Sequence, residues 1–193
     1  MKEILLLIGA YLLGSVPTGL LLAKALGVNI RESGSGNIGA TNVYRTIGRK
    51  LGIITLIGDC LKGLIPVLLA KSLGLPDVWV AAIGLAALLG HVFTIFLGFK
   101  GGKGVATALG VFLGTSPLSV LAALVIFAVV LYTWRFVSLA SIVAAALIPA
   151  LVWFTDGKQE TVLMAVAIAA VVIFRHQENI SRLRAGTESK FKA

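Results

Sequence analysis

The segment from Arg31 to Arg45 combines closely spaced glycines with hydroxyl and amide side chains. Glycine lets successive backbone N–H groups converge on one anion, and the polar side chains add further donors. The segment therefore suits a phosphate group, although its composition is also typical of a flexible surface loop with a helix cap. Its candidate binding residues are Ser35, Gly36, Asn37, Gly39, Thr41 and Asn42.

Two arginines extend this candidate site, because Arg45 and Arg49 are four residues apart. On one helix they would project from the same face. Guanidinium groups bind phosphate oxygens in a bidentate manner. The spacing therefore predicts a phosphate clamp.

A second glycine-rich segment contains two lysines, Lys100 and Lys103, and leads into an apolar run. The arrangement predicts an anion site at a helix N-terminus. It does not fit the nucleotide P-loop, because Gly104 stands where Ser or Thr should follow the lysine, and the glycine spacing differs. We therefore expect no ATP binding. The glycines that we assign to this site are Gly101, Gly102 and Gly104.

A third polar segment begins at Arg175. On a helix His176, Asn179 and Arg182, each three residues from the next, would form one polar stripe toward the other loops. The alternative is a basic tail that binds anionic lipid headgroups.

Ionisable residues also occur within apolar runs. Asp59 and Lys62 are three apart and form either a structural ion pair or an edge of the active site. His91, about two turns before Lys100, is either a packing histidine or a further substrate-binding residue.

The composition of the whole chain identifies lipid as its main solvent. Of 193 residues, 58% are hydrophobic and 13% charged, and the mean hydropathy is +1.00, far outside the soluble range. The net charge of +9 fits anionic headgroups or a phosphorylated substrate, and burial in a membrane argues against nucleic acid. A single cysteine, Cys60, excludes an intrachain disulfide and a cysteine metal cluster.

We predict an all-α, polytopic membrane bundle of about seven segments, because roughly 20 apolar residues cross a bilayer. Residues 1–193 would form one membrane domain. The segment 105–114 is too short to cross without tilting, and a re-entrant half-helix is the alternative. The predicted spans are 4–23, 51–73, 78–98, 105–114, 118–134, 136–154 and 161–174.

Seven crossings place the polar segments 24–50, 99–104 and 175–193 on one face. Together with Arg135, which lies between two spans on the same side, that face then carries 13 of the 17 Lys and Arg residues. The positive-inside rule makes it cytoplasmic and puts the N-terminus outside.

Five ordered motifs support a resemblance to a known family. They are Gly-Ser-x-Pro-Thr-Gly (14–19), Ser-Gly-Asn-Ile-Gly-Ala-Thr-Asn (35–42), Gly-Asp-x-x-Lys-Gly (58–63), Gly-His before Phe-Lys-Gly-Gly-Lys-Gly-Val-Ala-Thr (99–107), and Arg-His-x-x-Asn-Ile-x-Arg-Leu (175–183). Together they resemble the bacterial membrane acyl-phosphate:glycerol-3-phosphate acyltransferases, the PlsY family. The chain departs from the family pattern at Thr94, where a proline is expected.

The resemblance implies transfer of a fatty acyl group from acyl phosphate to the 1-hydroxyl of glycerol 3-phosphate. The products would be lysophosphatidic acid and phosphate, and the location the bacterial inner membrane. No cofactor or metal is expected, and the oligomeric state stays open. Our hypothesis is that glycerol 3-phosphate is held by Ser35, Arg45, Lys103, His176 and Asn179, and the acyl-phosphate head by Asn37, Gly39, Thr41 and nearby N–H groups.

Both the mechanism and the functional class have alternatives. The general base is either a substrate phosphate oxygen or His176, because no His-x-x-x-x-Asp pair is present. A nucleophilic Ser35 or Ser33 lacks an evident triad. A transporter of phosphate or a phosphorylated solute would also use helix-terminal anion sites, although the polar motifs gather on one face. A noncatalytic lipid-binding scaffold is a third functional class, beside the acyltransferase and the transporter.

Overall fold

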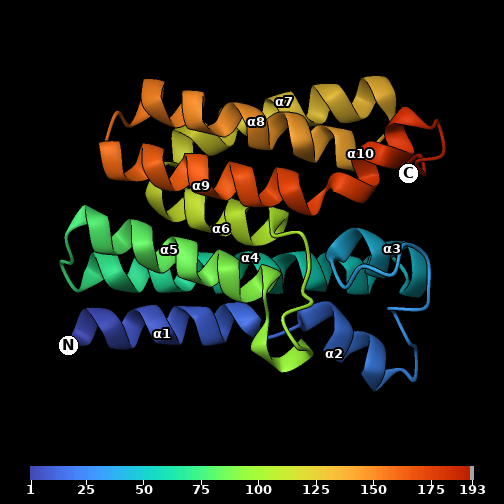
Figure 1. Ribbon diagram of the computed structural model, residues 1–193, viewed down its shortest axis with the longest axis horizontal. Coiled ribbons are helices and arrows are strands. Elements are labelled where there is room, and N and C mark those ends of the chain that lie inside the picture. Colours follow the sequence, from blue (N-terminus) through green and yellow to red (C-terminus); the bar gives the residue numbers. More distant parts are fainter. Residues whose placement is uncertain (192–193) are drawn as a thin grey trace. The chain divides into compact units, whose positions relative to one another are not determined.

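The computed structural model describes residues 1–191, which contain helices and no strand (Figure 1). The all-α prediction is therefore confirmed. The helices are α1 (Lys2–Ser15), α2 (Thr18–Ala25), α3 (Ala40–Ile47), α4 (Arg49–Ser72), α5 (Asp77–Val92), the 3₁₀ helix η1 (Ile95–Leu97), α6 (Val105–Thr115), α7 (Pro117–Trp134), α8 (Val137–Thr155), α9 (Gln159–Arg175) and α10 (Gln177–Arg184).

Five helical stretches within residues 1–191 are long and apolar enough to cross a membrane. A sixth is added if α9 and α10, bent by 55° at their junction, count as one span. The helix α6 is shorter and apolar, as the sequence predicts. Helix lengths thus support a multi-pass membrane protein without confirming the number seven. The five stretches are Lys2–Ala25, Arg49–Ser72, Asp77–Leu97, Pro117–Trp134 and Val137–Thr155.

The chain divides into two compact units, Met1–Gly114 and the residues from Thr115 onward. The prediction of one membrane domain stays a prediction.

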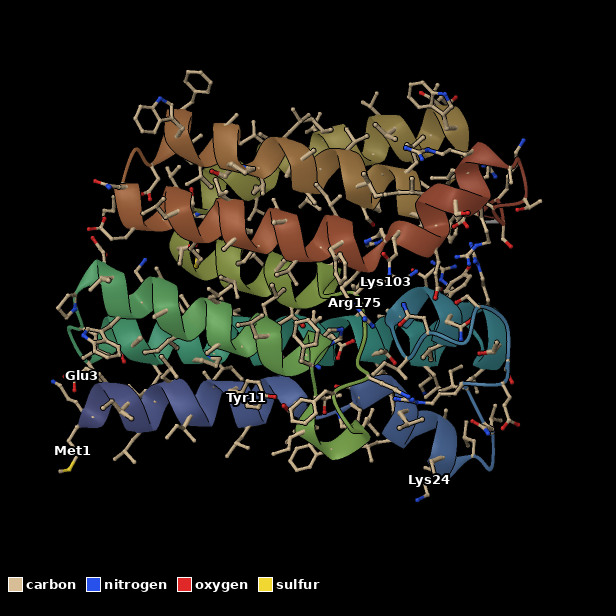
Figure 2. The ribbon with its side chains drawn as sticks, viewed as in Figure 1. Met1, Glu3, Tyr11, Lys24, Lys103 and Arg175 are labelled. Atoms are coloured by element: carbon tan, nitrogen blue, oxygen red, sulfur yellow. The ribbon has the colours of Figure 1, made fainter. Side chains whose placement is uncertain are left out.

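In the first unit α1 packs against α4 and α5 (Figure 1). Glycines make the close approach possible, because a Cβ at Gly14 would overlap the Ala87 carbonyl and a Cβ at Gly90 would overlap the Tyr11 carbonyl. The Tyr11 hydroxyl reaches the chain beyond α5 and donates to the Phe93 carbonyl at 2.6 Å (Figure 2). Helices α4 and α6 meet in the same way, at Gly110 against the carbonyl of Cys60.

The predicted span 4–23 is two helices with a break at Val16 and Pro17. Proline has no N–H to continue the helical ladder and disfavours the α conformation of the residue before it. Val16 accordingly has φ −60° and ψ 115°. Its carbonyl accepts a hydrogen bond from Lys62 Nζ at 2.9 Å, so the break is joined to α4.

In the second unit α8 packs between α7 and α9, and α10 contacts both α8 and α9. A cluster of hydroxyls connects α7 to the end of α8. Ser116 Oγ lies 2.7 Å from Ser119 Oγ, and Ser119 Oγ lies 2.5 Å from Thr155 Oγ1. These bonds satisfy polar groups in an otherwise apolar helix pair.

Candidate active site

The buried side chain of Asn42, on the first turn of α3, organises the glycine-rich loop before it. Its Oδ1 accepts a hydrogen bond from the Ser35 N–H at 2.8 Å. Its Nδ2 lies within bonding distance of three carbonyls, those of Ile30 (3.2 Å), Ser33 (3.0 Å) and Asn37 (2.8 Å). Asn42 was predicted to bind substrate, and its amide instead makes these contacts within the loop. The sequence pattern alone does not distinguish these two uses.

The loop needs glycine at two turns. Gly34 and Gly36 have φ of +59° and +69°, a left-handed conformation that glycine adopts without steric cost. At Gly34 a Cβ would also overlap Asn42 Oδ1. The turns leave Ser35 exposed and the remaining predicted donors half-buried, namely Gly36, Asn37, Gly39 and Thr41.

The two arginines do not share a helix. Arg45 is exposed in the last turn of α3, and α3 ends before Gly48, which has φ +110°. Arg49 then begins α4. The prediction of a clamp from one helical face is therefore wrong, because the four-residue spacing argument requires a continuous helix.

The second glycine-rich segment begins at a tight turn and is fixed to the end of α5. Gly98 and Phe99 both have positive φ, and the Lys100 N–H donates to the Leu97 carbonyl at 3.2 Å. A bulky residue such as Phe99 rarely adopts this conformation. The Gly101 N–H then donates to the Val92 carbonyl at 3.0 Å.

Thr94 takes over the role expected of a proline. Helix α5 ends at Val92, and Thr94 Oγ1 donates to the Ser15 carbonyl at 2.6 Å. The Phe99 N–H donates to the Thr94 carbonyl at 2.9 Å. The helix therefore ends without proline, because polar contacts hold the chain in its new direction.

The two glycine-rich segments lie together. Arg31 Nη2 donates to the Lys100 carbonyl at 2.6 Å. Beneath the first segment, Leu97 packs against a core of Ala23, Ile30, Ile38 and Val43. The first unit therefore brings together the predicted phosphate-binding loops, with Lys103 half-buried and Lys100 exposed.

The ionisable residues of α4 and α5 lie close to the second loop. Asp59 Oδ1 is 2.9 Å from Lys62 Nζ and 3.8 Å from His91 Nδ1. All three side chains are buried. His91 also contributes its carbonyl, which accepts the Gly102 N–H at 3.1 Å.

In the second unit His176 lies at the bend between α9 and α10. Its Nδ1 is 2.7 Å from the Val172 carbonyl. A carbonyl can only accept, so we infer that Nδ1 carries the proton. In the neutral ring Nε2 is then the basic nitrogen, as a general base or a hydrogen-bond acceptor would require.

Sequence reasoning missed Glu188, which binds the polar stripe of α10. Its carboxylate accepts hydrogen bonds of 2.7 Å from Ser138 Oγ, Asn179 Nδ2 and Arg182 Nε. The predicted shared face of Asn179 and Arg182 is thus present. The sequence signal that could have identified Glu188 was its acidic side chain within a basic tail.

The hydrogen bonds to Glu188 make the stability of this unit depend on pH. Burial favours the neutral acid, but the donors of Ser138, Arg182 and Asn179 outweigh it and hold the pKa of Glu188 below its ordinary value. A lowered pKa stabilises the fold above the ordinary glutamate value, and this stabilisation is lost as the pH falls through the lowered pKa.

Replacing Glu188 by glutamine is expected to lower the Tm by about 5 °C or more near pH 7, since hydrogen bonds to a charged group are lost. Thermal unfolding in detergent, between about pH 7 and about pH 3, checks this. The wild type should lose more Tm across that range than Glu188→Gln. Glu178→Gln is the control, because its side chain is 76% exposed and lies 3.9 Å from Arg182. Equal Tm values for Glu188→Gln and the wild type at pH 7 would contradict this role.

Comparison with known proteins places the whole chain in one family. The family model described as glycerol-3-phosphate acyltransferase matches residues 4–186. A protein of that name from Geotalea daltonii is 72% identical over 99% of this chain and 98% of its own length. Another from Geobacter sulfurreducens is 64% identical over the full length of both chains.

A solved structure of similar fold exists in two forms. The crystal structure of PlsY (YgiH), an integral membrane glycerol 3-phosphate acyltransferase, in its glycerol 3-phosphate form is 44% identical to this chain, with a TM-score of 0.96. The alignment covers 100% of this chain and 96% of that one. The form with lysophosphatidic acid gives a TM-score of 0.93.

Proposed function

This chain belongs to the glycerol-3-phosphate acyltransferase family, and from that premise we propose that it transfers a fatty acyl group from acyl phosphate to the 1-hydroxyl of glycerol 3-phosphate. The products are 1-acylglycerol 3-phosphate, a lysophosphatidic acid, and inorganic phosphate. The reaction supplies a precursor of phospholipids.

The observation that carries the proposal is the pairing of two glycine-rich, cation-bearing loops by the bond from Arg31 to the Lys100 carbonyl. Both proposed substrates carry a phosphate group, and backbone N–H groups with nearby cations bind phosphate. The donor also has a long apolar chain. An enzyme inside the membrane can take such a donor directly from the lipid phase.

The chemistry needs little from the protein beyond positioning and electrostatics. Acyl phosphate is a mixed anhydride, and phosphate is a good leaving group. The 1-hydroxyl oxygen forms a bond to the carbonyl carbon, the bond from that carbon to the phosphate oxygen breaks, and phosphate leaves with the electron pair. Fixed N–H donors and cations stabilise the negative charge that develops on the carbonyl oxygen.

We assign glycerol 3-phosphate to Ser35, Arg45 and Lys103, and the acyl-phosphate head to Asn37, Gly39 and Thr41 with neighbouring N–H groups. These assignments follow from the charges and donors of the two loops. For His176 and Asn179 the proposed contact with substrate rests on the family resemblance. Further proposed substrate-binding residues are Gly36, Arg49, Lys100, Gly101, Gly102 and Gly104.

The hydroxyl proton passes either to a phosphate oxygen of the substrate or to Nε2 of His176. The variant His176→Ala distinguishes the two routes. If the substrate accepts the proton, the variant keeps a measurable kcat and loses mainly affinity for glycerol 3-phosphate. If His176 is the base, catalysis is lost while glycerol 3-phosphate still binds.

We also propose that the protein lies in the bacterial inner membrane with both glycine-rich loops and the C-terminal segment on the cytoplasmic side. The excess of Lys and Arg in these segments supports this orientation. Glycerol 3-phosphate then arrives from the cytoplasm, and acyl phosphate from the lipid phase.

The test of the reaction compares donors in separate assays. Purified protein in detergent is mixed with labelled glycerol 3-phosphate and palmitoyl phosphate, palmitoyl-CoA or palmitoyl acyl carrier protein. Lysophosphatidic acid is expected with palmitoyl phosphate as the donor and with neither of the two thioesters. Product only from a thioester would overturn the donor. Folded protein that forms no product with any donor would overturn the function and favour a transporter, which a liposome uptake assay would then test.

A further inference from the structure

The buried cluster formed by Asp59, Lys62 and His91 has no part in the chemistry proposed above, yet it lies directly under a substrate loop. A charge within a membrane span costs at least about 2.5 to 3.5 kcal/mol on insertion scales and is usually tolerated for a function. Pairing of Asp59 with Lys62 at 2.9 Å reduces this cost. It does not explain why a third ionisable group faces the same carboxylate oxygen.

His91 connects this carboxylate to the loop 98–104. Its ring faces Asp59 Oδ1 through Nδ1 at 3.8 Å, a distance at which the interaction is electrostatic and not a direct hydrogen bond. The other edge of the ring lies against Gly102. A Cβ at Gly102 would overlap the ring, and it would stand 2.8 Å from His91 Cε1.

The backbone at the end of α5 also contacts the loop 98–104. The carbonyl of His91 accepts the Gly102 N–H at 3.1 Å, and the carbonyl of Val92 accepts the Gly101 N–H at 3.0 Å. A Cβ at Gly101 would stand 2.6 Å from the Val92 carbonyl oxygen. The loop just before Lys103 is therefore held against the end of α5, at His91 and Val92.

Lys62 fixes the other side of the cluster. Its Nζ donates to the Val16 carbonyl at 2.9 Å, at the break between α1 and α2. The carboxylate of Asp59 is thus held by a lysine that is itself bonded to the chain between α1 and α2. A side chain with this support has few alternative positions, so it can restrict the ring that faces it.

We propose that Asp59 is a positioning residue that, through His91, holds the loop 98–104 in the conformation that binds glycerol 3-phosphate. Neither side chain contacts the substrate in this proposal. Lys62 neutralises Asp59 and fixes it in place. The proposal rests on the proposed function, because the binding of glycerol 3-phosphate at this loop is part of it.

A positioning role predicts a change in KM for glycerol 3-phosphate and little change in kcat. Asp59→Asn and His91→Ala should each raise this KM by about tenfold, while kcat at saturation changes less than about threefold. In the double variant Asp59→Asn/His91→Ala the KM should be no higher than in His91→Ala alone, since Asp59 acts through the ring.

Asp77→Asn is the matched control. It removes a carboxylate from the first turn of α5, about 21 Å along the helix from His91. It should leave the KM for glycerol 3-phosphate unchanged. A KM increase in this variant equal to that of Asp59→Asn would overturn the proposal, because the effect would then not be local.

A purely structural ion pair gives a different pattern. Asp59→Asn would lower the Tm with an unchanged KM, and Asp59→Asn/Lys62→Met would restore the Tm, because no unpaired buried charge remains. That outcome overturns the proposal. If Asp59 is a positioning residue, Asp59→Asn/Lys62→Met has the Tm of the wild type but keeps the raised KM for glycerol 3-phosphate. The double variant gives this test even if Asp59→Asn alone does not fold.

Wild-type protein in the same assay distinguishes failure of the proposed acyltransferase function from failure of the positioning role of Asp59. An inactive, folded wild type means that the proposed function is wrong. An active wild type with unchanged KM in Asp59→Asn and His91→Ala means that the function stands and the positioning role is wrong.

Discussion

Replacing Lys103 by methionine is expected to lower kcat/KM for glycerol 3-phosphate by about 100- to 1000-fold. Loss of one donor that stabilises developing charge typically has this effect. Methionine keeps the apolar stem and removes only the ammonium group. The Tm should change little, because Lys103 is half-buried. Steady-state kinetics with palmitoyl phosphate measures this effect.

Two further variants complete this test. Lys103→Arg keeps the charge and should retain more activity than Lys103→Met. Lys24→Met is the control, because Lys24 is an exposed lysine of the same unit that projects outward from α2 (Figure 2). Lys103→Met with activity within about threefold of the wild type would remove Lys103 from the proposed site.

Replacing Asn42 by alanine is expected to lower kcat/KM by about 100-fold or more, although Asn42 does not touch the substrate in our account of the site. The substitution removes the hydrogen bonds to Ser35, Ser33 and two other backbone groups, each worth about 1 kcal/mol. Donors displaced by about 1 Å are enough for a loss of this size. The Tm should fall as well.

Asn42→Asp refines this prediction. Aspartate keeps the shape and one acceptor oxygen but presents no donor to the loop carbonyls, so activity should fall as far as in Asn42→Ala. Asn29→Ala is the control, since Asn29 is an exposed amide in the same loop that accepts a bond from the Arg31 N–H at 3.3 Å. Full activity of Asn42→Asp would show that these donors are not needed.

The helical fold could be predicted from hydropathy because lipid requires every backbone polar group of a span to be satisfied within a helix. The predicted segment 105–114 corresponds to α6, and 136–154 to α8 (Val137–Thr155). Hydropathy did not reveal the break at Val16 and Pro17, because the residues from Lys2 to Ala25 together are apolar enough to cross a membrane. Pro17 was the physical signal for that break.

Residue types in the loops indicated phosphate chemistry, but the direction of each side chain depends on contacts distant in sequence. Asn42 and Asn37 look equivalent in the sequence, and only the folded loop shows the amide of Asn42 bonded to the backbone. The positive φ of Gly48 separates Arg45 from Arg49. A spacing rule for one helix could not include that turn.

The ionisable residues of the spans illustrate the same limit. The sequence predicted the pair of Asp59 and Lys62, because three residues along a helix bring two side chains to one face. It gave no reason to place His91 of another helix against the same carboxylate. That contact follows from the packing of α5 against α4.

The most direct test of the central claim measures both products in one reaction. Protein reconstituted in liposomes receives palmitoyl phosphate with and without glycerol 3-phosphate, and lysophosphatidic acid and inorganic phosphate are quantified together. With acceptor, the two products should appear in equal amounts, and without acceptor phosphate release should be negligible. Phosphate release that does not depend on glycerol 3-phosphate, or that occurs without lysophosphatidic acid, would contradict direct acyl transfer by this protein.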